Sequence, residues 1–215
     1  MTERLSKIFS VLPSCKVFAD IGCDHGYIAK AMLDSGKCER AIISDISEKC
    51  LKKAQTLLAK DIENGKVDSV VSNGFEKVDF CDLALIAGMG GEEIISIIEN
   101  AKNLPNKLVL QPMKNAERVR VAVVEKGYRI LDDFVFYCGE KYYHLIALEK
   151  GNDHLTDDEI HFGRTNLKEK SDDFLRYLGE RINLYRERIN SGSLGEKALN
   201  EMVKVVEKLE KICIK

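Results

Sequence analysis

The sequence predicts an α/β fold in which a mostly parallel, doubly wound sheet of seven strands is followed by two antiparallel helices. Three features support this prediction. Short apolar runs alternate with helix-like segments through the first 150 residues, the last two runs are only four residues apart, and strand-like patterns stop after Gly151. Alternating strands and helices are typical of parallel sheets, whereas so short a connection joins antiparallel strands.

The first five predicted strands lack polar alternation, which suits strands buried on both faces of a parallel sheet. These strands occupy residues 17–20, 41–45, 68–71, 83–86 and 107–110, and helical patterns lie around residues 27–35, 48–60, 91–101 and 115–126. Two further strands, at about 128–137 and 142–149, form the closing hairpin. We therefore expect residues 1–150 to form one domain built on a Rossmann-like sheet.

Residues 151–215 are predicted to form a second, helical domain. Apolar residues recur there at spacings of three and four in two runs, which are separated by the turn-like segment 190–195. Such spacing places the apolar side chains on one face of each helix, as in a two-helix coiled coil. The runs are Phe174, Leu178, Ile182, Tyr185 and Ile189, and then Leu199, Met202, Val206, Leu209 and Cys213.

The composition, with 45% hydrophobic and 32% charged residues, is that of a globular protein. No apolar run approaches the length needed to cross a bilayer, and no signal-peptide core is present. The seven cysteines contain no C-x-x-C pair, so we predict neither a disulfide framework nor a metal site. We expect a cytoplasmic protein with no membrane partner, and the sequence leaves its oligomeric state open. The formal net charge of −2 does not indicate a nucleic-acid binder, although it can hide a local patch.

The first candidate site follows the first predicted strand, in the segment Asp20-Ile21-Gly22-Cys23-Asp24-His25-Gly26-Tyr27. Gly22 permits a tight turn and close approach of a ligand, and Gly26 lets the next helix start near the sheet. Asp24 occupies the middle glycine position of the dinucleotide motif G-x-G-x-x-G. Because the two carboxylates of Asp20 and Asp24 would repel a pyrophosphate, a cofactor with a sulfonium and an amino-acid end is a better match. A plain turn with an incidental Asp is the alternative.

Two later strand ends carry groups that could hold the nucleoside part of such a cofactor. Asp45, with Ile46 beside it, ends the second predicted strand, where a carboxylate accepts hydrogen bonds from ribose hydroxyls. Alternatively, Asp45 or Ser47 caps the next helix. Asn73 and Gly74 follow the third strand and could reach the adenine edge, although Asn-Gly is also a common turn.

The fourth and fifth strands end in a glycine loop and in a Gln-Pro pair. In the loop Ala87-Gly88-Met89-Gly90-Gly91, Ala87, Gly88 and Met89 could border the cofactor, while Gly90 and Gly91 could admit a flat acceptor. Gln111 could hydrogen-bond a planar heterocycle, and Pro112 stops its strand. A structural glycine turn and a loop-capping Gln are the alternatives.

The motifs Asp-Ile-Gly-x-Asp-His, Ala-Gly-Met-Gly-Gly and Leu-x-Leu-Gln-Pro, in this order and spacing, resemble the bacterial tRNA adenine-N1 methyltransferases that act on adenosine 22, the TrmK family. The resemblance covers almost the whole chain, including the helical pair, which resembles that family's coiled-coil domain. Asp24-His25 and the loop 88–91 are its specific parts, whereas Asp20 and Gly22 are common to class I methyltransferases, whose sheets also close with an antiparallel hairpin.

This resemblance implies S-adenosylmethionine as cofactor, tRNA as partner, and methyl transfer to N1 of an adenine. One departure is Asn73, where many class I enzymes carry Asp, although an Asn oxygen can still accept a hydrogen bond. Because adenine N1 has an in-plane lone pair, positioning can supply most of the acceleration. Asp24 could stabilise the cationic product, or take a proton from the N6 amine directly or through His25. Tyr27 could stack on the target base, although packing is the commoner role.

A tRNA partner requires cationic contacts to phosphate. Residues 102–129 hold seven Lys and Arg residues against two Glu residues. Lys114, Arg118 and Arg120 flank the Gln111 strand end and are the predicted tRNA contacts, with a solvated helix face as the alternative. The helical segment has no excess of positive charge, so it would grip tRNA by shape or serve as a protein-contact arm.

Three other functions compete with this interpretation. The same fold could methylate another RNA or a small molecule, or it could bind the cofactor without turnover and use its helices for protein assembly. A nicotinamide oxidoreductase is disfavoured because Asp24 replaces a glycine of the dinucleotide motif.

Overall fold

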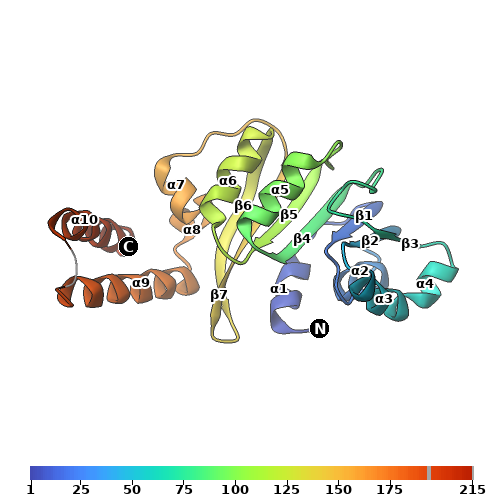
Figure 1. The fold of residues 1–215 in the computed structure, drawn as a ribbon, viewed down its shortest axis with the longest axis horizontal. Helices are drawn as coiled ribbons and strands as arrows, with labels where there is room; N and C mark the ends of the chain where they lie inside the picture. Colours follow the sequence, from blue (N-terminus) through green and yellow to red (C-terminus); the bar gives the residue numbers. More distant parts are fainter. Residues whose placement is uncertain (193–194, 215) are drawn as a thin grey trace.

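The computed structural model describes residues 1–192 and 195–214 and confirms the predicted fold class. The seven strands form one sheet in the order β3-β2-β1-β4-β5-β7-β6 (Figure 1). The first five strands run parallel, and β7 pairs antiparallel with both β5 and β6. The strands are β1 (Val17–Ile21), β2 (Arg40–Asp45), β3 (Val67–Val71), β4 (Leu83–Met89), β5 (Lys107–Pro112), β6 (Tyr128–Cys138) and β7 (Lys141–Lys150).

Helices cover both faces of the sheet, because successive strand side chains point to opposite faces and both sets are apolar. One face packs against α1 (Glu3–Val11), α2 (Tyr27–Asp34) and α3 (Glu48–Leu57), and the other packs against α5 (Gly91–Asn100) and α6 (Ala116–Glu125). In β1, for example, Phe18 belongs to the first core, whereas Ala19 and Ile21 belong to the second.

Four helices were absent from the sequence prediction or merged in it. The segment 48–60 breaks at Leu58 into α3 and a short α4 (Ala59–Glu63). The helix α1 begins after Thr2, whose side chain accepts from the backbone N–H of Leu5. Two further short helices, α7 (Asp157–Phe162) and α8 (Arg164–Glu169), connect the hairpin to the C-terminal helices.

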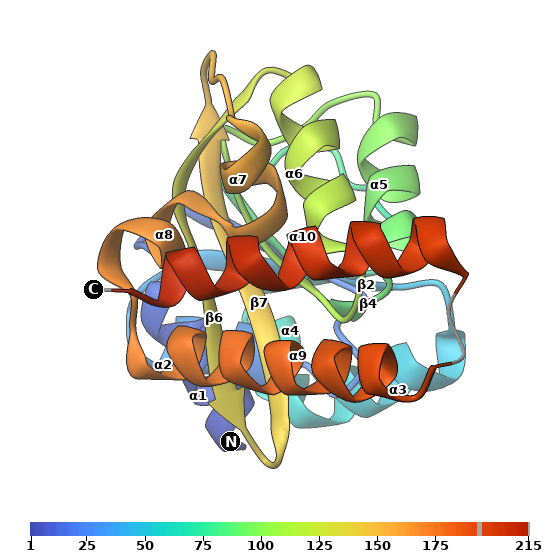
Figure 2. The same ribbon diagram turned by 90° about the vertical axis from the view of Figure 1, so that its left-hand side faces the viewer.

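The two predicted C-terminal helices are α9 (Asp172–Asn190) and α10 (Glu196–Cys213), which lie side by side in opposite directions (Figure 2). Residues 193 and 194 of the predicted turn 190–195 lie outside the described residues. The apolar face of α9 also packs against Val135 of β6, so the helical pair is continuous with the edge of the sheet. None of the helices in the described part of the chain is both long and apolar enough to cross a membrane.

Candidate active site

A cavity of about 820 Å³ opens at the carboxyl ends of the parallel strands. The sheet order reverses there, because β1 is flanked by β2 on one side and by β4 on the other. Such a switch point is where open α/β sheets bind their ligands. The predicted residues that line the cavity are Asp20, Gly22, Asp24, His25, Tyr27, Asp45, Ile46, Asn73, Gly74, Ala87, Gly88 and Met89.

Two glycines bring the backbone to the cavity surface. Gly22 has a φ of +73°, and a Cβ added to it would lie 2.0 Å from Cε of Met89. Gly74 has a φ of +57°, and its Cβ would lie 2.7 Å from Cγ2 of Ile97. Because L side chains rarely adopt this conformation, both positions favour glycine, and a Cβ at Gly74 would also collide with the branched side chain of Ile97.

Asp45 ties two loops together at the cavity. Its Oδ1 accepts from the backbone N–H of Ser47 at 2.8 Å, and its Oδ2 accepts from that of Asp24 at 3.3 Å. The N-cap of α3 is Ser47, whose Oγ accepts from the N–H of Cys50. Of the alternatives, Ser47 therefore caps the helix, and the Asp45 carboxylate is held at the cavity by backbone donors.

Asp20 is buried at the floor of the cavity, where it is 6% exposed. Burial disfavours its charged form and raises the pKa of its carboxyl to about 7, and the nearby Asp45 carboxylate adds to this shift. The backbone N–H of Ala29 acts in the opposite direction. Near neutral pH the Asp20 carboxyl is therefore poised to ionise when a cationic group arrives.

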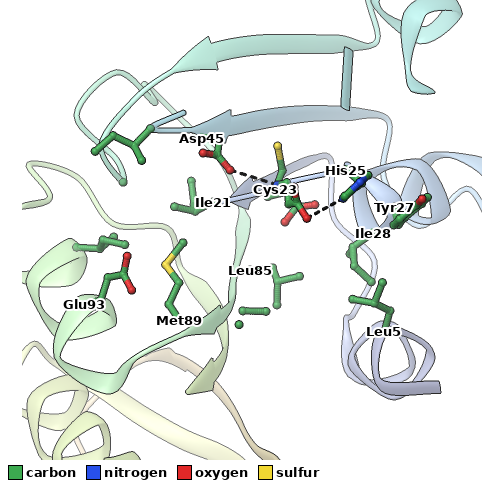
Figure 3. Close-up of a pocket in the computed structure, with 18 of the residues that line it drawn as sticks. Leu5, Ile21, Cys23, His25, Tyr27, Ile28, Asp45, Leu85, Met89 and Glu93 are labelled. Carbon is green, nitrogen blue, oxygen red and sulfur yellow. Dashed lines mark hydrogen bonds and ion pairs between the residues drawn. The ribbon is translucent and has the colours of Figure 1, made fainter. Parts of the chain in front are cut away.

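Asp24 and His25 form a polar pair at the rim. Nδ1 of His25 lies 2.7 Å from Oδ2 of Asp24, and Nζ of Lys53 lies 3.2 Å from Oδ1. Desolvation acts to raise the pKa of Asp24, but the hydrogen bonds from His25 and Lys53 together hold it below its ordinary value. The His25 ring stacks on Tyr27, with centroids 5.4 Å apart. Met89 and Glu93 lie across the cavity from this pair (Figure 3).

Residues 1–146 match the family model described as "Methyltransferase domain". The chain belongs to this family. It is 28% identical over 157 residues to the tRNA (adenine(22)-N(1))-methyltransferase of Bacillus subtilis (strain 168), covering 71% of this chain and 66% of the relative.

Two solved structures share the fold of this methyltransferase. TrmK of M. capricolum, in complex with S-adenosyl-homocysteine, has a TM-score of 0.87 at 25% identity, covering 99% of this chain and 97% of that one. The B. subtilis M1A22 tRNA methyltransferase TrmK has a TM-score of 0.84 at 24% identity, covering 99% of this chain and 98% of that one. These relatives confirm the resemblance to the TrmK family that the sequence motifs indicate.

Several predicted substrate contacts of the methyltransferase lie outside the cavity lining. A Cβ on Gly90 would lie 3.3 Å from Cε of Lys114, and a Cβ on Gly91 would lie 2.6 Å from the carbonyl oxygen of Lys114. Gly91 is therefore a packing glycine at the start of α5. Gly26, which is predicted to belong to the cofactor site, also lies outside the lining and permits close packing, because a Cβ on it would lie 2.9 Å from that of Ala54.

Gln111 and Pro112 are both buried, and Gln111 is 0% exposed. Its Oε1 accepts from Arg4, and its Nε2 donates to the carbonyl oxygen of Pro112. The predicted direct contact of Gln111 with a substrate base is therefore wrong, because its amide is already engaged inside the protein.

Of the three predicted tRNA contacts, Lys114 and Arg118 are exposed, and Nη1 of Arg118 pairs with Glu92 at 2.6 Å. The prediction for Arg120 is wrong: its side chain is 0% exposed and forms an ion pair with Asp133 inside the protein. A guanidinium that is fully enclosed cannot reach a phosphate.

The sequence prediction missed three parts of the cavity wall, which come from α1, from α5 and from the β6–β7 hairpin. The spacing of Leu5, Ile8, Phe9 and Leu12 is that of an amphipathic helix and could have revealed α1. No local sequence pattern indicates that α5 and the β6–β7 hairpin border the cavity. The missed wall residues include Arg4, Leu5, Glu93, Ile97, Cys138 and Tyr143.

Proposed function

We propose that this protein transfers a methyl group from S-adenosylmethionine to N1 of an adenine in tRNA, with adenosine 22 as the position. The observation that carries the proposal is a single cavity in which the Asp45 strand end, suited to a nucleoside, adjoins the Asp24-His25 pair. The B. subtilis relative is named for this reaction, and the M. capricolum structure holds S-adenosyl-homocysteine.

The residues present fit S-adenosylmethionine. Asp45 would accept from the ribose hydroxyls, and Ile46, which is 71% exposed at the cavity, would cover an apolar face of the nucleoside. Gly22, with its positive φ, would let the cofactor approach the backbone closely. Asp20 offers a buried carboxyl to a cationic group. When bound, the cofactor supplies an electrophilic methyl group.

The chain's own contribution at the acceptor is positioning and charge stabilisation. Adenine N1 needs no base before it attacks, so the cavity walls act by holding the ring and excluding water. The adenine becomes cationic as its N1 is methylated. Asp24, whose lowered pKa keeps it ionised at neutral pH, would stabilise that charge. His25, hydrogen-bonded to Asp24, would accept and relay a proton from the N6 amine.

The tRNA would approach across the cavity rim. Lys114 is exposed, its side chain approaches Gly90, which follows the cavity-lining Met89, and none of the described carboxylates pairs with it. The helical pair α9 and α10 would contact the tRNA by shape, in keeping with the general mode of RNA recognition. With tRNA as its substrate, the protein would act in the cytoplasm.

The test is methylation of tRNA transcripts, followed by mass-spectrometric mapping of the modified nucleotide. We expect one N1-methyladenosine at position 22 and none in a transcript with guanosine there. Faster methylation of ribosomal RNA or of a small molecule than of tRNA would mean that the proposed acceptor is wrong. Cofactor binding without turnover on any acceptor would instead favour an assembly module.

A further inference from the structure

Arg4 crosses from α1 to the far end of the cavity. Its Nη1 donates to Oε1 of Gln111 at 2.6 Å, and its guanidinium carbon lies 5.7 Å from the centroid of the Tyr143 ring. The same Nη1 lies 3.6 Å from the position of a Cβ on Gly88. The Arg4 guanidinium is therefore fixed beside the glycine loop after β4 and lines the cavity.

The sheet order assigns Arg4 to one half of the cavity. Asp45 ends β2, whereas Gln111 is next to last in β5 and Tyr143 lies on β7. Because β1 and β4 separate β2 from β5, Arg4 and Asp45 lie at opposite ends of this edge. Asp45 marks the half proposed to hold the nucleoside of the cofactor, so Arg4 lies away from that nucleoside, toward the part of the cavity that the acceptor would enter.

The hydrogen-bond partner of Arg4 is the neutral amide of Gln111, which leaves the positive charge of the guanidinium uncompensated. Gln111 is 0% exposed, and its Nε2 donates to Pro112, so its oxygen must face Arg4. Among residues 1–192 and 195–214, no carboxylate lies within ion-pair distance of Arg4, and its side chain makes no second hydrogen bond. A guanidinium carries five N–H donors in a fork that matches an oxyanion.

We infer that Arg4, oriented by Gln111, binds a backbone phosphate of the target nucleotide. A contact with the reacting edge of the base is disfavoured, because the adenine becomes cationic on methylation and a guanidinium would repel it. A phosphate bound by Arg4 would let the nucleotide be held by its backbone while its base enters the cavity. This inference rests on the proposed tRNA substrate.

The test compares Arg4→Gln with Arg40→Gln in the full chain. Arg40 pairs with Asp68 at the opposite edge of the sheet, so its variant removes one charge away from the cavity. For Arg4→Gln we expect the tRNA Kd to rise roughly ten-fold, the scale of a lost charge-assisted contact. The slope of log Kd against log salt concentration should fall by the amount expected for about one lost phosphate contact. S-adenosylmethionine affinity, measured by calorimetry, should not change. Arg40→Gln should match the parent protein throughout.

A tRNA series with single methylphosphonates around position 22 then identifies the phosphate. One of these methylphosphonates should weaken tRNA binding by the parent protein. The same methylphosphonate should cause no further loss of tRNA binding by Arg4→Gln. Gln111→Met should reproduce part of the loss, because the guanidinium keeps its charge but loses its support.

Loss of cofactor affinity in Arg4→Gln, with tRNA binding intact, would overturn the inference and assign Arg4 to the cofactor's carboxylate. Parent-like behaviour in every assay would also overturn it. A parent protein that methylates no tRNA would instead contradict the proposed function itself.

Discussion

Arg120 and Asp133 form a two-bond ion pair inside the protein, with Nε and Nη2 of the arginine donating to the two carboxylate oxygens at 2.6 and 2.9 Å. The side chains are 0% and 1% exposed. Nη1 of Arg120 also donates to the carbonyl oxygen of Ile160, at 2.9 Å. The pair thereby joins α6, β6 and α7, and it attaches the segment after the hairpin to the sheet.

We predict that Asp133→Ala lowers the free energy of unfolding by about 3–5 kcal/mol, because it leaves a buried guanidinium without its partner. Urea unfolding followed by circular dichroism measures this. Asp68→Ala, which breaks the exposed pair with Arg40, is the control and should change stability by about 1 kcal/mol or less. Equal effects of the two variants would mean that the burial of Arg120 has little energetic consequence.

Asp45→Ala should weaken S-adenosylmethionine binding by roughly ten-fold or more, because the variant loses a charge-assisted acceptor for the ribose. Calorimetry on the folded variant checks this. Asp68 lies on the neighbouring strand outside the cavity, so Asp68→Ala should bind as the parent does. Unchanged affinity in Asp45→Ala would remove this residue from the cofactor site.

Asp24→Asn should lower kcat by about ten-fold or more and leave cofactor affinity nearly unchanged, because an amide neither stabilises a cation nor accepts its proton. Lys53→Gln gives a second readout. The Lys53 hydrogen bond lowers the pKa of Asp24, so its loss should move the acid limb of the kcat profile to higher pH. If Asp24→Asn had the same single-turnover rate as the parent, Asp24 would have no part in the mechanism, and positioning of the base would account for catalysis.

The strands and the cofactor half of the cavity could be predicted because their signals are local. Each of the first five strands is an apolar run, and Asp20, Gly22 and Asp45 stand at strand ends, which parallel pairing brings to one edge. The acceptor half depends on long-range docking, as between Arg4 and Gln111, 107 positions apart. Nothing near either residue in the sequence encodes that contact.

Arg120 illustrates the same limit from the other direction. A count of charges places it with Lys114 and Arg118 on a basic surface, and its helix does carry exposed residues. Its burial depends on Asp133, in the next strand, and on α7 closing over the pair. Charge patterning alone could not distinguish an enclosed guanidinium from a solvated one.

The pH dependence of the cofactor site follows from Asp20. Its folded pKa, about 7, is raised above that of an unfolded aspartate. The protonated form therefore stabilises the folded protein, fully below about pH 4, and this contribution is lost as the pH rises through 7. S-adenosylmethionine carries positive charge and favours the ionised form. At pH 6, binding should thus release up to one proton, and affinity should increase toward pH 8.

Calorimetry at pH 6 in two buffers of different ionisation enthalpy measures the released proton. Asp20→Asn is the matched variant, because it keeps the size of the side chain and cannot ionise. It should abolish the proton release, flatten the pH dependence of affinity, and remove the decline in stability between pH 4 and 7 that Asp20 causes. Proton uptake on binding by the parent, or release that persists in Asp20→Asn, would show that another group titrates and that the Asp20 carboxyl does not face the cofactor's charge.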